Sequence, residues 1–312
     1  MRINQEVQHE MEQKAVLALL QEIVPEVIEG FEAPYRLFRY DKGDDRFYYR
    51  MADSHLIPYL SVTSFTHKSL PTSQYLLDWY GKMGSAAANQ YKKTAAEYGT
   101  ILHIEAVEAF KENRYSWRTL EKTLMEKMPQ QYRYLYGEWL WTLKKDLMAF
   151  FQFRKDAIVN IIALEIPVYS DKYRLAGTID MVCEIKFGGK TVYAIIDFKS
   201  GKKGFWEAHE LQLHCYKELW NERFGGLIEV THVFNFAPNN WTKKPTYKLK
   251  NQTKSHFATS ASARMQMAMI EGWIIPPDNY FDIIGEVGDL TEFDYTQHLI
   301  CDNTMSNALI NA

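Results

Sequence analysis

The chain has 312 residues, of which 46% are hydrophobic and 14% aromatic, and its formal net charge is −3. This composition predicts a substantial buried core and argues against global disorder. No apolar run approaches the roughly 18 residues needed to span a bilayer, and the polar start is unlike a signal peptide. Three cysteines without metal-binding spacing, Cys183, Cys215 and Cys301, predict a reducing, cytoplasmic environment and no iron–sulfur cluster.

Charge is unevenly distributed along the chain. No Lys or Arg follows Arg264, whereas eight acidic residues do: Glu271, Asp278, Asp282, Glu286, Asp289, Glu292, Asp294 and Asp302. With those eight set aside from the 39 acidic residues, the remainder holds 31 acids against 36 bases and is mildly basic. The acidic C-terminal segment, 276–312, is either a solvated tail or a segment that competes with a polyanion for a basic face.

The N-terminal half is predicted to be mainly helical. Region 1–60 contains an amphipathic helix over 5–22, then a β-hairpin with arms at 35–40 and 46–51. Region 61–160 carries helices expected over 74–113, 117–128 and 130–159. Gly81, Gly84 and Gly99 mark expected breaks or close approaches within the first of these helices.

From residue 161 the periodicity changes from helical to strand-like. Strands are expected over 161–169, 173–187, 191–199, 227–236 and 246–249, and helices over 207–223 and 255–273. This order predicts an α/β (α+β) fold whose core occupies 161–275, behind the helical N-terminal half. The run Ala194–Ile196 is apolar on both faces, as in a central strand.

A hairpin within this core places two carboxylates face to face. If Gly188-Gly189 form its loop, Phe187 pairs with Lys190 and Asp180 lies opposite Asp197. Opposed residues share a face with Cβ atoms roughly 4.5–5.5 Å apart, and like charges placed so repel each other. Lys199, two residues beyond Asp197, shares that face. The cluster therefore suits a hard divalent metal with a positive charge beside it.

The ordinary alternative is a purely structural hairpin, because Gly-Gly turns and charged strand ends are common. A longer loop or a bulge would also turn the faces over. Residues outside the hairpin bear on this choice. Gln212 and Tyr216 share one helical face, Gly99 and His103 have the same spacing, and a turn at Asp171-Lys172 would place Glu165 opposite Thr178. Each of these alone also has a structural explanation.

The ordered set is more specific than its parts. Gly-x-x-x-His, Glu, Gly-x-x-Asp, Asp-x-Lys and Gln-x-x-x-Tyr occur in that order at Gly99, His103, Glu165, Gly177, Asp180, Asp197, Lys199, Gln212 and Tyr216. This order resembles the RecB-type exonuclease branch of the PD-(D/E)xK nuclease superfamily. Ser61-Val62-Thr63-Ser64 is similar to a stretch found in phage-type and mitochondrial single-strand exonucleases of that branch. The chain departs from the pattern at Ile179, where proline is often found, and it carries no helicase motif.

The resemblance implies a restriction-endonuclease-like core with a central mixed β-sheet flanked by helices. It implies that one or two Mg²⁺ or Mn²⁺ ions bind Asp180, Asp197, the Phe198 carbonyl and His103. Lys199 would orient the attacking water or stabilise negative charge. Gln212 and Tyr216 would position Lys199 or contact a phosphate, and Glu165 would act through a water or by orienting a ligand.

Contacts with DNA are expected on both sides of these motifs. Thr63 and Ser64 are candidates to donate hydrogen bonds to phosphates, and Lys202 and Lys203 to follow the backbone, with Lys92 and Lys93 as weaker candidates. Four aromatic residues of the helical half, Trp79, Tyr80, Tyr91 and Tyr98, either stack on unpaired bases or belong to the core.

The sequence thus predicts a metal-dependent DNA exonuclease acting on single-stranded or end-processed DNA in replication, recombination or repair. The alternatives are a structure-selective endonuclease on the same fold and a catalytically silent DNA-binding subunit. DNA with a free end is the expected partner and no membrane is; a helicase, recombinase or single-strand-binding partner is left open.

Overall fold

The computed structural model of the chain describes residues 21–23, 26–27, 35, 37–42, 45–52, 55–111, 115–201 and 204–272. Three predictions lie outside these residues: Lys202 and Lys203, the acidic segment 276–312, and the helix over 5–22 as far as residue 20. The last two residues of that expected helix belong instead to a short strand, β1 (Gln21–Ile23).

Ten strands form one sheet. In chain order they are β1, β2 (Glu26–Val27), β3 (Leu37–Lys42), β4 (Asp45–Ala52), β5 (His55–Ser61), β6 (Ile158–Ser170), β7 (Leu175–Phe187), β8 (Lys190–Phe198), β9 (His232–Pro238) and β10 (Tyr247–Asn251). Their spatial order is β1-β3-β4-β5-β7-β8-β9-β10, with β6 also paired to β7 and β2 to β6. Because β5–β7 and β8–β9 are parallel and the other pairs are antiparallel, the sheet is mixed, as predicted.

The helices follow β5, β8 and β10 in the sequence. They are α2 (Val62–Ser69), α3 (Gln74–Met83), α4 (Ser85–Lys111), α5 (Trp117–Lys127), α6 (Tyr136–Ala157), α7 (Glu207–Phe224) and α8 (Phe257–Ile270), with a 3₁₀ helix at Gln130–Leu135. Of the three glycines flagged as breaks, Gly84 separates α3 from α4 and has a φ of 79°. A left-handed residue at a helix end is the position that glycine favours.

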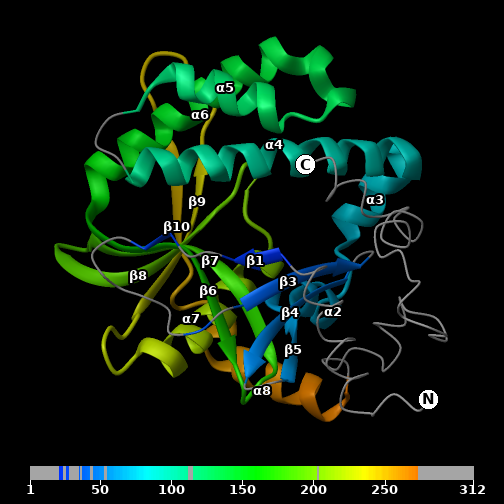
Figure 1. Ribbon diagram of the computed structural model, residues 1–312, viewed down its shortest axis with the longest axis vertical. Coiled ribbons are helices and arrows are strands. Elements are labelled where there is room, and N and C mark those ends of the chain that lie inside the picture. Colours follow the sequence, from blue (N-terminus) through cyan, green and yellow to red (C-terminus); the bar gives the residue numbers. More distant parts are fainter. Residues whose placement is uncertain are drawn as a thin grey trace, which may run out of the picture.

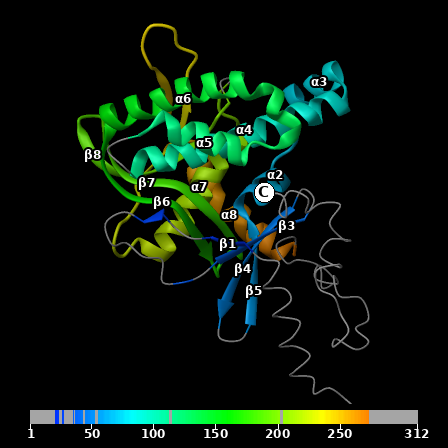
Figure 2. The ribbon, with the colours of Figure 1, turned by 45° about the horizontal axis from the view of Figure 1, so that its top comes forward.

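Two helical layers enclose the sheet. Figures 1 and 2 show α4, α5 and α6 on one face, whereas α7 and α8 lie on the other. The two largest hydrophobic clusters match this division: one joins α7 and α8 to Ile195 and Val233, and the other joins α4 and α6 to Ile196 and Phe234. The alternation of neighbouring strand residues between the two layers is the period-two pattern of a strand buried on both faces. The fold is therefore the predicted α/β arrangement.

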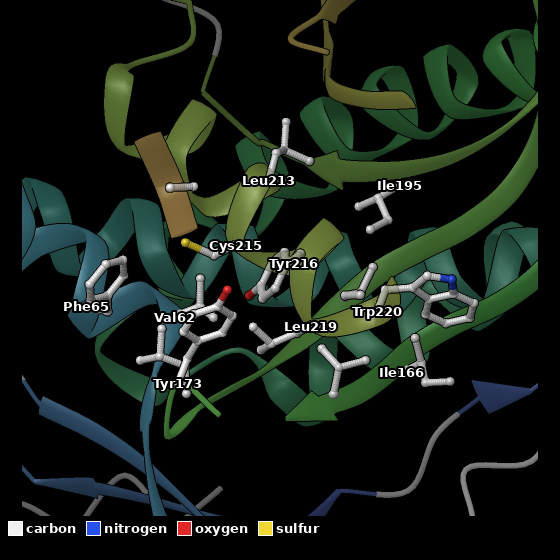
Figure 3. Close-up of a cluster of buried hydrophobic side chains, with 14 of the residues drawn as sticks. Val62, Phe65, Ile166, Tyr173, Ile195, Leu213, Cys215, Tyr216, Leu219 and Trp220 are labelled. Atoms are coloured by element: carbon white, nitrogen blue, oxygen red, sulfur yellow. The ribbon is translucent and has the colours of Figure 1, made fainter. Parts of the chain in front are cut away.

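Helix α7 is fixed to the sheet by its apolar side chains. Figure 3 shows Leu213, Cys215, Tyr216, Leu219 and Trp220 of this helix packed with side chains of the strands and of α2. Glu207 and Glu210 lie in its first turn and Arg223 in its last, which matches the helix dipole. This packing sets which way the polar residues of α7 face.

Strand β5 was not among the expected strands, and Pro58 lies within it. Proline cannot donate a ladder hydrogen bond and is confined to strand positions that do not need one. Strands β3, β4 and β5 nevertheless form an antiparallel meander that joins the same sheet through the parallel β5–β7 pair. Among the described residues, no helix combines the length and the hydropathy of a membrane-spanning segment.

Candidate metal and catalytic site

The β7–β8 hairpin has the predicted register. Phe187 pairs with Lys190 across the Gly188-Gly189 turn, and the ladder runs in step as far as Met181 and Ile196. Continuation of this register makes Asp180 and Asp197 neighbours at the far end. There the Asp180 carboxylate turns toward β8, and its Oδ2 accepts a hydrogen bond from the Phe198 backbone N at 2.6 Å.

Phe198 fixes the end of β8 in the core. Its ring lies 5.0 Å from that of Phe150, 5.8 Å from that of Phe110 and 6.0 Å from that of Phe236. Aromatic rings at these separations contribute favourable packing beyond their buried area. Because the side chain is held on the α4–α6 side, the Phe198 carbonyl is left facing His103, whose Nε2 lies 3.1 Å from it.

His103 lies between two carboxylates. Its Nδ1 is 3.6 Å from Asp180 Oδ1 and 3.9 Å from Glu165 Oε1. One ligand atom from each of these three residues lies within 4.8 Å of the other two, which is a spacing that a metal ion can bridge. Helix α4 and the consecutive strands β6 and β7 supply the three side chains.

Glu165 has an unusual backbone conformation and lies opposite a residue other than the one predicted. The pairs Leu164–Met181 and Ile166–Ile179 place it opposite Asp180 rather than opposite Thr178, so the predicted pairing was wrong by two residues. The cause is a four-residue turn after Ser170, which pairs with Leu175, in place of the expected two-residue turn. Glu165 has a φ of 47°, a left-handed conformation that a non-glycine residue adopts at a cost of about 1–3 kcal/mol.

Asp197 belongs to a second set of contacts. Its Oδ1 accepts a hydrogen bond from Lys199 Nζ at 2.8 Å, and its Oδ2 accepts one from Asn235 Nδ2 at 2.7 Å. Lys199 Nζ also donates to Gln212 Oε1 at 3.3 Å, and Gln212 Nε2 donates to the Tyr216 hydroxyl at 3.1 Å. The predicted catalytic residues of β8 and α7 are therefore joined in one hydrogen-bonded chain.

Two glycines allow these elements to approach one another. A Cβ on Gly177 would lie 2.6 Å from Tyr216 Cε1, so a side chain on β7 would displace the tyrosine. A Cβ on Gly99 would lie 3.2 Å from Ser200 Oγ, which brings α4 close to the residue after Lys199. The need for glycine at positions 99 and 177 of the two motifs thus has a steric basis.

The carboxylates are buried among few positive charges. Burial lowers the pKa of His103, but the charges of Asp180 and Glu165 outweigh it and raise that pKa to about 9. Burial raises the pKa values of Asp180 and Asp197. Three carboxylates, at Glu165, Asp180 and Asp197, thus face two cationic side chains, His103 and Lys199, and a bound cation would relieve the excess negative charge.

The donor set fits a divalent metal. Glu165 Oε1 is buried and accepts no hydrogen bond, although such oxygens are normally satisfied in folded proteins. It lies in the group formed with His103 and Asp180, and carboxylate and carbonyl oxygens with one imidazole suit Mg²⁺ or Mn²⁺. The structure brings together His103, Asp180 and the Phe198 carbonyl, which were predicted to lie together. Glu165 lies within the same group, whereas it was expected to act through a water or by orienting a ligand.

One of the two hydroxyl residues expected to contact phosphate, Ser64, makes its hydrogen bonds within the protein. Ser64 is buried in α2, where its Oγ accepts a hydrogen bond from the Arg46 backbone N at 2.9 Å and lies 3.0 Å from Ser61 Oγ. Ser61 in turn caps α2 by accepting from the Ser64 backbone N. Thr63 is half-buried. The Ser64 hydroxyl thus ties α2 to β4.

The aromatic candidates fall into two groups. The Tyr98 hydroxyl donates to Asp146 Oδ2 at 2.7 Å, and its ring packs on Trp139, so Tyr98 belongs to the core. Trp79 contacts both Tyr80 and Tyr91 on the outside of α3 and α4, and Tyr91 is exposed. This second group remains available to a ligand.

Sequence reasoning missed Asn235, which bonds to Asp197. A signal was present, because an asparagine between Phe234 and Phe236 in an apolar strand must find a buried partner. It also missed His209, whose pKa is lowered to about 4 by burial and by the charge of Lys199.

Comparison with known proteins supports the order of motifs. A family model described as the PD-(D/E)XK nuclease superfamily matches residues 74–279, a span that includes every residue of the site from His103 to Tyr216. No curated protein matches the chain. A solved structure described as "Crystal structure of SSO0001" is 13% identical, with 55% of this chain and 84% of that chain covered, at a TM-score of 0.20. That score is too low to indicate a shared fold.

Proposed function

The chain belongs to the PD-(D/E)XK nuclease superfamily, and on that premise we propose that it is a metal-dependent DNA exonuclease of the RecB-type branch. Its substrate is single-stranded DNA or DNA with a processed free end. The observation that carries the proposal is the convergence of five separate sequence motifs at one place. His103, Glu165 and Asp180 lie within 4.8 Å of one another, and Lys199 lies beside them in contact with Asp197.

The metal would be held by His103, Glu165, Asp180 and the Phe198 carbonyl, with Asp197 alongside. When bound, a divalent cation lowers the pKa of a coordinated water and offsets the charge that develops on the phosphate. The buried Oε1 of Glu165 accepts no hydrogen bond, which supports this set, since a cation would satisfy it.

Lys199 supplies the positive charge on the other side of the reacting phosphate. Its ammonium group is held between Asp197 and Gln212, so it is oriented before the substrate arrives. A donor fixed in advance stabilises developing negative charge without reorganising during the reaction. Tyr216 holds Gln212 in turn, which gives both α7 residues a positioning role.

The exonuclease assignment rests on the motif order that resembles the RecB-type branch, and on fold-level analogy. Helix α4 supplies His103, and its other end lies next to α3 (Figure 2). Helix α3 has no buried residue and carries the exposed Tyr75 and the half-buried Trp79 and Tyr80. Such side chains offer stacking surfaces for unpaired bases.

Cleavage of matched linear and circular single-stranded DNA tests the proposal. Linear strands labelled at the 5′ or the 3′ end should be shortened in Mg²⁺ or Mn²⁺, and the label released first gives the polarity. Circular strands of the same sequence should remain intact. Cleavage of the circles at a similar rate would identify an endonuclease, and DNA binding without any cleavage would identify a catalytically silent subunit.

A further inference from the structure

A buried pair of side-chain amides lies behind Asp197. Asn235 is aligned with Asp197 in the parallel β8–β9 register, and its Nδ2 donates to Asp197 Oδ2 at 2.7 Å. Asn235 Oδ1 accepts from Gln252 Nε2 at 3.2 Å. The exposed fractions of Asn235 and Gln252 are 0% and 3%, so water does not compete with these bonds.

The order of these bonds fixes which way each amide faces. An asparagine side chain has one acceptor oxygen and one donor nitrogen. Because the Gln252 amide donates to Asn235 Oδ1, the nitrogen of Asn235 is directed at Asp197. Asp197 Oδ2 is thereby turned toward β9, and Asp197 Oδ1 is left facing Lys199.

Gln252 is itself anchored on two sides. Its backbone N donates to the Val233 carbonyl at 2.9 Å, which ties it to β9. Its own carbonyl lies 2.9 Å from Nε2 of His214, a buried residue of α7. His214 lies between Gln212 and Tyr216 in the sequence. Gln252 therefore connects to Asp197 through Asn235 and to the helix that holds Gln212 through His214.

The cost of burying these groups indicates that they do more than fill space. Asn235 lies between Phe234 and Phe236 in the core of the sheet, where an apolar side chain would pack without needing hydrogen bonds. Its amide is satisfied by Asp197 and Gln252, so the arrangement depends on an acceptor oxygen at Asp197.

We propose that Asn235 and Gln252 are positioning residues that hold Asp197 in the orientation needed to engage Lys199 and the metal. Neither residue touches the substrate. Without the amide bond, the Asp197 carboxylate loses one of the two side-chain hydrogen bonds that orient it, so its contact with Lys199 loosens and its position beside the proposed metal ligands is less well fixed. The inference rests on the proposed metal-dependent nuclease function.

The test compares Asn235→Ala with a matched asparagine elsewhere. Asn221 on α7 also bonds through both amide atoms, to the N and O of Val230, and lies outside the site, so Asn221→Ala is the control. Three quantities are measured for each variant: the thermal midpoint without metal, the Mn²⁺ dissociation constant by calorimetry, and the cleavage rate at saturating Mn²⁺.

We expect Asn235→Ala to weaken Mn²⁺ binding and slow cleavage by roughly 10–100-fold, as for removal of groups that orient metal ligands in other proteins. Asn221→Ala should lower the thermal midpoint but leave Mn²⁺ affinity and the cleavage rate near the wild-type values. If Asn235→Ala does not fold, Gln252→Ala provides the second variant, with a smaller effect in the same direction.

Two outcomes overturn the inference in distinguishable ways. In the first outcome, the wild-type protein binds Mn²⁺ and cleaves DNA, but the folded variant, Asn235→Ala or Gln252→Ala, behaves like Asn221→Ala. The positioning role is then wrong and the nuclease function stands. If the wild-type protein neither binds Mn²⁺ nor cleaves DNA, the proposed function fails and the positioning role fails with it.

Discussion

Lys199 is the side chain whose environment most resembles that of a preorganised catalytic cation. It bonds to a buried carboxylate at 2.8 Å and to a glutamine at 3.3 Å, and it lies at the end of a central strand. Its side chain is 21% exposed, so it reaches solvent while remaining held. In the proposed function, a substrate phosphate would therefore meet a positive charge that is already oriented.

Replacement of Lys199 by alanine should lower the cleavage rate by at least about 100-fold, which is the size of loss expected when a donor that stabilises transition-state charge is removed. DNA binding, followed by fluorescence anisotropy, should persist because the other basic residues proposed to contact the DNA backbone are unchanged. Lys186→Ala, at the opposite end of β7, is the matched control and should leave the rate unchanged. Substantial activity in Lys199→Ala would remove Lys199 from its assigned role.

Asp180 has a structural bond as well as its expected metal contact, since Oδ2 accepts from the Phe198 N. Asp180→Asn keeps an acceptor oxygen for that bond but removes the charge. The variant should therefore fold with a similar thermal midpoint and bind Mn²⁺ at least about 10-fold more weakly, because a hard cation prefers anionic oxygen. Calorimetry that finds equal Mn²⁺ affinity would show that Asp180 is not a ligand.

At the scale of elements, loop length decided which registers were predictable. The Gly188-Gly189 loop allows one tight turn, and the whole β7–β8 ladder follows from it. The β6–β7 connection was predicted with a two-residue turn, but Asp171–Arg174 form a four-residue one in which Arg174 has a φ of 52°. The local sequence Asp-Lys-Tyr-Arg does not predict that the arginine adopts a left-handed conformation. A shift of two residues preserves the face, which is why Glu165 still reaches Asp180.

Contacts that depend on the pairing of parallel strands could not be predicted from the sequence. Asn235 meets Asp197 because β9 pairs with β8 in parallel after the α7 crossover, and no short turn fixes that register. Likewise β5 joins β7 across more than a hundred intervening residues. Composition and periodicity predicted the α/β class and most helices, and local motifs predicted the site residues, but not the partners supplied by distant strands.

The packing of α7 on β7 gives a steric prediction. Gly177→Ala would place a Cβ within 2.6 Å of Tyr216, so we expect a loss of about 1–3 kcal/mol in the free energy of unfolding and reduced cleavage. Gly137→Ala in α6 is the control, because a Cβ there meets nothing within 4 Å and should raise stability by up to about 1 kcal/mol. Urea denaturation of both variants distinguishes them; equal stability would mean that Tyr216 moves aside freely.

At the scale of the whole molecule, Asp171 links the N-terminal meander to the core and to α7. Its carboxylate accepts from the Tyr59 hydroxyl at 2.5 Å, from Arg223 at 2.8 Å and from Arg50 at 3.3 Å. Burial opposes ionisation, but these hydrogen bonds and charges outweigh it and lower the pKa of Asp171.

Because the pKa of Asp171 is lowered in the folded state, its ionised carboxylate stabilises the folded protein at pH values above the ordinary carboxyl pKa of 3.8. This stabilisation is lost as the pH falls through the folded-state pKa. Asp171→Asn should therefore cost about 1 kcal/mol or less at pH 7, given that the side chain is 47% exposed. The difference from wild type should shrink below pH 3.8, as followed by thermal unfolding across pH. A constant difference would exclude this linkage.

The three layers meet where the β7–β8 ladder ends. Helix α4 brings His103 from one side of the sheet, α7 brings Gln212 and Tyr216 from the other, and β6 supplies Glu165 between them (Figure 1). A site assembled from both helical layers is complete only in the folded chain, and its chemistry depends on a cation that its excess of carboxylates favours.

Degradation of linear single-stranded DNA by the wild-type protein and by Asp180→Asn, with Mn²⁺ and with chelator, tests this account most directly. We predict that the wild-type protein degrades the strand only with the metal present, and that Asp180→Asn does not degrade it under the same conditions. Degradation in the presence of chelator, or equal degradation by the variant, would contradict a metal-dependent nuclease site at His103, Glu165 and Asp180.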